Sequence, residues 1–103
     1  QEDDCLEGAI STLDIVGCFQ ASRGHWDKEV EVLSNNLAQS SSEDFFDQFK
    51  DAEKMWGVYE ESLMKNFLIH AQEQGGSIMK IQTASLYSDL AKSRFLQLVR
   101  FYE

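Results

Sequence analysis

The chain has 103 residues, 43% of them hydrophobic and 26% charged, and it contains no proline. This length suits one globular domain, and seven Phe, three Tyr and two Trp supply bulk for a core, which argues against an intrinsically disordered chain. The net charge of −9 argues against a partner that is nucleic acid or an anionic membrane, because both attract clustered Lys and Arg. No apolar run approaches the roughly 20 residues that a membrane-spanning helix requires. A basic or uncharged partner is therefore favoured.

Charge is unevenly distributed along the chain. Residues 1–60 hold 14 acids and 4 bases, whereas residues 61–103 hold 4 acids and 5 bases. A run of acids is most simply explained as a solvent-exposed face. The negative electrostatic potential that it produces also speeds the encounter with a cationic partner.

The two cysteines, Cys5 and Cys18, are an even pair in a small chain. Structural zinc needs four nitrogen or sulfur ligands, and two thiols with two distant histidines make a poor set. A disulfide in an oxidising compartment is the simpler interpretation. The sequence opens at Gln1 without an initiator Met or an apolar leader, as after removal of a signal peptide or trimming of a longer chain. We therefore expect a secreted or periplasmic protein.

The first predicted helix opens near Ser11-Thr12, where a hydroxyl can accept hydrogen bonds from the free N–H groups of the first turn. Gly17 and the stretch Ser22-Arg23-Gly24 favour a bend or break midway. Asn35-Asn36 and the polar run 39–42 end the helix. Its apolar face follows spacings of four, three and four, at Trp26, Val30, Leu33 and Leu37.

The second predicted helix has the strongest amphipathic pattern. Ser42 is its expected N-cap, and Glu43 and Asp44 complement the positive helix end. Gly75-Gly76 should end it, because glycine readily adopts the left-handed conformation found there. Trp56 and Tyr59 belong to the apolar stripe and are predicted to lie in the core. The whole stripe is Phe45, Phe49, Ala52, Trp56, Tyr59, Leu63 and Phe67.

The third predicted helix starts with Ser77 as its N-cap and continues to the end of the chain. One face carries apolar residues at helical spacing, namely Ala84, Tyr87, Ala91, Phe95, Leu98 and Tyr102. Three helices with short connections predict an all-α fold, a small antiparallel three-helix bundle forming a single domain over residues 1–103. The N-terminal segment should be fastened to the bundle by one disulfide.

No residue pattern in the chain favours catalysis, a metal or a cofactor. His25 and His70 are far apart and lack an HExxH or His-plus-Cys pattern. The paired carboxylates Asp47/Asp51 and Glu60/Glu61 lie on one helix, whereas glycosidases place two carboxyl groups across a cleft. Gly75-Gly76-Ser77 is too short for a phosphate-binding loop. We therefore expect a binding protein and no enzyme.

Several short motifs, taken in order, resemble a known family. They are Cys5 and Cys18 with Thr12 and Asp14 between them, Trp26-Asp27, Leu33 and Leu37, Trp56-Gly-Val-Tyr59, and Gly75-Gly76-Ser77-Ile78 followed by Leu90 and Arg94. Over nearly its whole length the chain resembles the LprI-like secreted or periplasmic domain of bacteria, which includes inhibitors of lysozyme.

The chain departs from that family's pattern in two places. Members usually carry a second cysteine pair at the positions of Met64 and Leu86. Because both are replaced by apolar residues, we predict that Met64 contacts Leu86. The Arg-Asp that commonly follows the Tyr is here Glu60-Glu61, which reverses the sign of one charge and puts the transfer of a specific partner surface in doubt.

The resemblance implies a protein that blocks a peptidoglycan-cleaving glycoside hydrolase of the lysozyme type. An immunity protein against a competitor's secreted hydrolase is a related possibility, and an envelope interaction or structural module without an enzyme target is the alternative. A cleft with two catalytic carboxyl groups repels an acidic plug. The neutral loop Gln74-Gly75-Gly76-Ser77 is therefore the expected insert, with Arg23-Gly24-His25 as the alternative. The acids expected to engage a basic rim and steer association are Asp47, Asp51, Glu60 and Glu61.

Overall fold

The computed structural model describes residues 2–40 and 42–102, and nearly all of them are helical. A short helix α1 (Glu2–Glu7) precedes three long ones, and a 3₁₀ turn η1 (Arg100–Tyr102) follows them. The long helices are α2 (Thr12–Ser40), α3 (Glu43–Gln74) and α4 (Ser77–Val99). The prediction of an all-α fold is confirmed, and the N-terminal segment is itself a helix.

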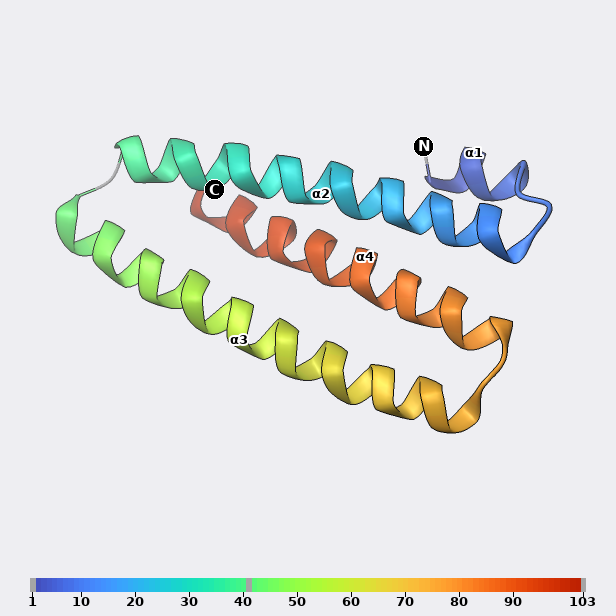
Figure 1. Cartoon of the computed structure of the whole chain (residues 1–103). Helices are drawn as coiled ribbons and strands as arrows, with labels where there is room; N and C mark the ends of the chain where they lie inside the picture. The colour runs from blue at the N-terminus through green and yellow to red at the C-terminus, as the bar shows by residue number, and fades with distance from the viewer. Residues whose placement is uncertain (1, 41, 103) are drawn as a thin grey trace.

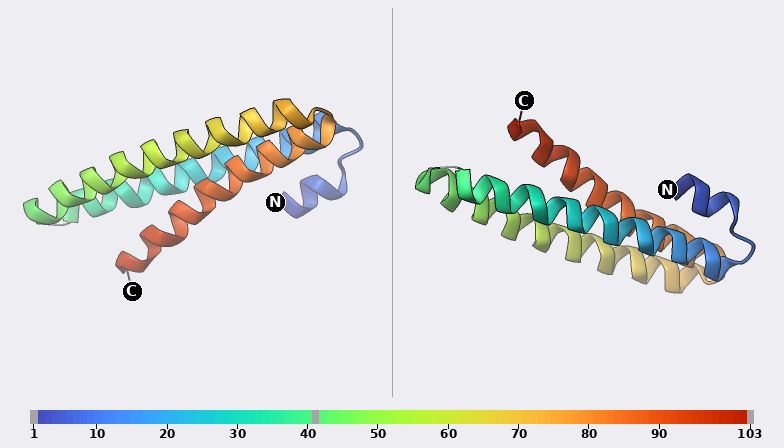
Figure 2. Two further views of the ribbon diagram at one scale, coloured as in Figure 1. Left: turned by 90° about the horizontal axis from the view of Figure 1, so that it is seen from below. Right: turned by 90° about the horizontal axis from the view of Figure 1, so that it is seen from above.

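The long helices are splayed rather than aligned. In Figure 1, α2 and α3 form a V that is narrow at their connection and wide at the other end, where α4 begins between them. The two views in Figure 2 show α4 leaving the plane of the V toward its C-terminal end. The molecule measures 48 × 30 × 16 Å, and its long dimension matches α3, since 32 helical residues span about 48 Å. A regular antiparallel three-helix bundle is not confirmed.

A break midway in the first long helix, one of the two expected outcomes, is wrong, because α2 runs unbroken through Gly17 and Gly24. Each glycine costs a helix only about 1 kcal/mol relative to Ala. Contacts with α4 offset that cost on either side of Gly24. The guanidinium of Arg23 donates to the backbone oxygen of Tyr87 at 2.8 Å, and the Trp26 ring lies 5.0 Å from that of Phe95.

The core is small and lies where α2, α3 and α4 approach one another. Leu37, Phe49 and Leu98 are buried together, and half-buried Val30, Leu33 and Phe45 pack around them. Among the described residues of α3 only Phe49 is fully buried, and the rest of its apolar stripe is less covered. Trp56 is accordingly half-buried, and Tyr59 is 54% exposed, so the prediction that Tyr59 is a core residue is wrong. Met64 and Leu86 are both half-buried, and their contact stays a prediction.

The ends of α3 follow the sequence signals. Ser42 is its N-cap, and the Phe45 N–H donates to the Ser42 hydroxyl at 3.2 Å. At the other end the Gly75 N–H donates to the Ala71 carbonyl at 2.8 Å. The next helix corrects one prediction, since its N-cap is Gly76 and not Ser77, which is the first helical residue of α4.

We expect Gly75→Ala to destabilise the protein by about 1 to 3 kcal/mol, because glycine alone adopts its backbone conformation without strain. Gly75 has φ 69° and ψ 179°, and an added Cβ would meet open space, so backbone strain is the whole effect. Chemical denaturation measures it. Gly57→Ala, in the middle of α3 and also with open space, is the control and should be neutral or stabilising. Equal stability of the two variants would contradict this explanation.

Candidate functional site

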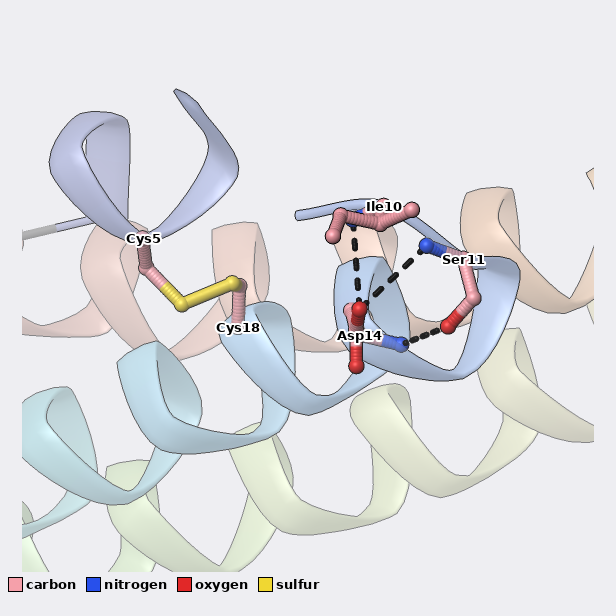
Figure 3. The surroundings of a disulfide bond; sticks show 5 residues. All are labelled: Cys5, Ile10, Ser11, Asp14 and Cys18. Atoms are coloured by element: carbon pink, nitrogen blue, oxygen red, sulfur yellow. Dashed lines mark hydrogen bonds between the residues drawn. A yellow bond between two sulfur atoms is a disulfide. The ribbon is translucent and has the colours of Figure 1, made fainter. Parts of the chain in front are cut away.

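A disulfide between Cys5 and Cys18 fastens α1 to α2 (Figure 3), as predicted, with 5.7 Å between the two Cα atoms. Such a bond fits an oxidising compartment. The start of α2 is held beside it. The Asp14 N–H donates to the Ser11 hydroxyl at 3.1 Å, and the Asp14 carboxylate accepts from the N–H groups of Ile10 and Ser11 at 3.2 and 3.3 Å. These hydrogen bonds to the charged form lower the pKa of Asp14.

An apolar groove of about 830 Å³ opens at the wide end of the V, between α2 and α3, with the first half of α4 as its third wall. Met79 is its buried apolar residue, and Val16 and Met64 are half-buried beside it. Leu13 and Leu68 line opposite sides of the groove and remain exposed. A concave apolar surface of this size falls in the range of ligand and partner sites.

Among the residues that the structure describes, no acid lines this groove, although the chain carries twice as many acids as bases. Its charged lining residues are Arg23 and Lys80. Arg23 is already paired, since its guanidinium contacts the carboxylates of Asp27 at 2.8 Å and Glu60 at 2.6 Å. Burial alone would lower the pKa of Arg23, but the hydrogen bonds and charges of these two carboxylates outweigh burial and raise it. Lys80 makes no ion pair with any residue that the structure describes.

The expected insert Gln74-Gly75-Gly76-Ser77 lies at the tip of the α3–α4 connection, and all four residues are exposed. Nothing lies within 4 Å of a Cβ built on either glycine, so both face open space, and without side chains they keep the tip slim. Gly75, Gly76 and Ser77 also line the end of the groove. Tip and groove are therefore continuous, and none of the described residues that form them is an acid, although exposed Glu73 directly precedes the tip.

The alternative insert Arg23-Gly24-His25 is the middle of α2 and not a loop. The Arg23 side chain is tied to Asp27, Glu60 and the Tyr87 carbonyl, while His25 is exposed against the edge of the Trp26 ring. This stretch presents a helix face held by internal bonds. It is thus a poorer plug than the glycine tip.

The four candidate rim acids do not have equivalent surroundings. Asp47, Asp51 and Glu61 are exposed, whereas Glu60 is half-buried in its ion pair with Arg23. Asp51 precedes Gln74 by 23 helical residues, which is about 35 Å along α3. A partner would therefore have to extend roughly the width of a small protein to touch both Asp51 and the tip.

We expect Glu60→Gln to destabilise the fold by about 1 to 3 kcal/mol, because it leaves the half-buried Arg23 with one carboxylate fewer. Glu61→Gln is a matched control in the next position. Glu61 is exposed and pairs with Lys65 one turn away, a contact worth about 0.5 kcal/mol at most. Urea unfolding of both variants measures the difference, and similar losses would show that burial does not strengthen the Arg23 pair.

Sequence reasoning missed the groove and the surroundings of Arg94. The Arg94 guanidinium lies 5.6 Å from the Trp56 ring centre and 5.9 Å from that of Phe49, and its buried Nη2 atom has no hydrogen-bond partner. Desolvation lowers the pKa of Arg94. The only sequence signal was the place of Arg94 among the family motifs, because Trp56 and Phe49 lie about 40 residues before it in the chain.

Two further features concern ligands and membranes. Among the residues described, no three His, Cys, Asp or Glu side chains are grouped so that they could hold a metal ion. None of the described helices is long and apolar enough to cross a bilayer.

The described residues thus form a small, disulfide-fastened helical protein with an exposed tip beside an apolar groove. A family model described as lysozyme inhibitor LprI matches residues 4–98, which is nearly the whole chain. The chain belongs to the LprI lysozyme inhibitor family. No curated protein and no solved structure matches it.

Proposed function

We propose that this protein binds and blocks a peptidoglycan-degrading glycoside hydrolase of the lysozyme type, in the periplasm or outside the cell. The observation that carries the proposal is the match to the lysozyme inhibitor family over residues 4–98. The disulfide supports the location, because such bonds persist in oxidising compartments. The name of the family describes an inhibitor and not an enzyme.

The glycine tip is the element proposed to enter the hydrolase. A lysozyme-type cleft holds two carboxyl groups across the scissile bond, so an inserted carboxylate would meet like charge. The residues from Gln74 to Ser88 include no acid and one base, Lys80. The tip is also narrow and exposed, as entry into a cleft requires. Both its charge and its shape therefore suit this role.

The acids elsewhere on the surface are proposed to act at longer range. Asp47 and Asp51 lie at the end of α3 that is remote from the tip. They are therefore better placed to attract a basic enzyme from a distance than to contact the rim of its cleft. Glu61 is nearer, at about 20 Å along the helix, and could reach a rim. Glu60 is occupied by Arg23. Of these four acids, Glu61 is therefore the one best placed to contact a basic rim.

The test is a lysis assay with lysozyme-type hydrolases from the host, from the neighbouring gene and from competing bacteria. Inhibition should saturate near one inhibitor per enzyme, and association should slow as salt screens the acids. Gln74→Trp should weaken inhibition at least about tenfold, because a bulky ring at the tip obstructs a tight fit. Gln48→Trp is the matched control, since it is also an exposed Gln on α3 but lies near the other end.

The outcomes separate the claims. If no hydrolase is inhibited, the proposal is wrong and an envelope interaction module without an enzyme target takes its place. If inhibition occurs but Gln74→Trp behaves like Gln48→Trp, the inhibitor assignment holds and the choice of the tip is wrong.

A further inference from the structure

Lys80 is the one base in the acid-free stretch of sequence that contains the tip. From Gln74 to Ser88 the chain holds no acid and no other base. Lys80 is exposed and lies in the first turn of α4, three residues after Ser77. Three helical residues span about 4.5 Å, so this side chain starts about one turn behind the tip. A cleft that receives the tip therefore also meets the ammonium group of Lys80.

The charge of Lys80 is not committed to a partner within the fold. Lys80 makes no ion pair with, and lies over no aromatic ring of, the residues within 2–40 and 42–102. Arg23, the other charged residue that lines the groove, is by contrast held by two carboxylates. Lys80 can therefore turn its charge toward an incoming partner without breaking an internal ion pair.

Two exposed acids, Glu73 and Asp14, flank the tip and the groove but do not neutralise Lys80. Glu73 does not line the groove, whereas Lys80 does. The Asp14 carboxylate accepts hydrogen bonds from the backbone N–H groups at the start of α2. The positive end of the α4 dipole lies near Lys80, and no acid in the first turn of α4 offsets it. Positive charge is therefore available on the groove side of the tip.

A lysozyme-type cleft offers a partner for this charge. Of its two catalytic carboxyl groups, one is kept protonated as the general acid and the other is ionised. A neutral tip avoids repulsion from the ionised group but gains no attraction from it. An ammonium group on a flexible stem beside the tip does gain that attraction, and exclusion of water from the cleft strengthens it.

We propose that Lys80 forms an ion pair with the ionised catalytic carboxylate of the hydrolase when the tip enters the cleft. The inference rests on the proposed function and names the contact that selects the partner. Lys80 favours hydrolases with an ionised carboxylate in the cleft. It disfavours cell-wall enzymes that work with a bound metal cation, because two positive charges repel one another.

A double-mutant cycle measured by titration calorimetry tests this contact. One change is Lys80→Met in this protein, and the other replaces the ionised carboxylate of an inhibited lysozyme-type hydrolase with its amide. Against the unaltered hydrolase, Lys80→Met should weaken binding at least about tenfold, as the loss of a close charge pair does. Against the amide variant it should weaken binding less than about twofold, because the charge that Lys80 contacts is already absent.

Lys92→Met is the matched control. Lys92 is also an exposed lysine of α4, and its loss changes the net charge equally, but it does not line the groove. This variant should bind both forms of the hydrolase about as tightly as the parent protein does. Circular dichroism should show that both variants keep their helices, since Lys80 makes no ion pair within the described structure.

The outcomes separate this contact from inhibition itself. If the parent protein inhibits a hydrolase but Lys80→Met binds it as Lys92→Met does, the proposed function stands and the contact is wrong. Equal weakening of Lys80→Met against both forms of the hydrolase also overturns the contact, because Lys80 then meets another group. If the parent protein inhibits no hydrolase, the proposed function fails and the contact fails with it.

Discussion

Replacing Leu98 with Ala should destabilise the protein by about 2 to 5 kcal/mol, the range measured when a large buried side chain is truncated. Leu98 is 0% exposed and packs in the cluster with Leu37 of α2 and Phe49 of α3. Because so few side chains are buried, each fully buried one accounts for a large share of the stability. Urea unfolding followed by circular dichroism measures the loss.

Leu96→Ala is the control for this prediction. Leu96 lies on the same helix but is exposed, so its truncation should change the free energy of unfolding by about 0.5 kcal/mol or less. Equal losses for the two variants would mean that α4 does not complete the core at Leu98.

Removing the disulfide should cost about 3 kcal/mol by the chain-entropy estimate for a loop of this length. Replacing Cys5 and Cys18 together with Ser tests this without leaving a free thiol. Few other bonds hold α1 in place, and one is the hydrogen bond from the Ser88 hydroxyl to the Glu2 carboxylate, at 3.5 Å. Hydrogen exchange should therefore show loss of protection in α1 while the long helices keep theirs.

Reduction of the unaltered protein provides a second route to the same state. Its loss of stability should match that of the double Ser variant. If the variant unfolds at the same urea concentration as the parent protein, α1 is held by packing and the disulfide is dispensable.

Much of the helical layout could be predicted from the sequence because its signals are local. Ser11 and Ser42 act through hydrogen bonds within their own first turns, and Gly75 ends α3 through its own backbone conformation. The continuity of α2 could not be predicted in this way. It depends on contacts of Arg23 and Trp26 with α4, more than 60 residues later.

For the candidate site, too, the features formed by neighbouring residues could be predicted, and those formed by the packing of helices could not. The tip was found because Gly75, Gly76 and Ser77 are adjacent in the chain. The groove was not, because its walls come from three helices and its width depends on the angle between α2 and α3. The pairing of Glu60 with Arg23 is likewise a product of helix packing, and it removes from the surface an acid that the sequence alone marks as available.

The central claim, inhibition by occupation of the cleft, is tested most directly by titration calorimetry with an inhibited hydrolase. The protein should bind the free enzyme at one-to-one stoichiometry. Its apparent affinity should fall in proportion as a chitin oligosaccharide fills the cleft, because one site cannot hold both. Binding that is unchanged by a saturating oligosaccharide, or no binding at all, would contradict the account.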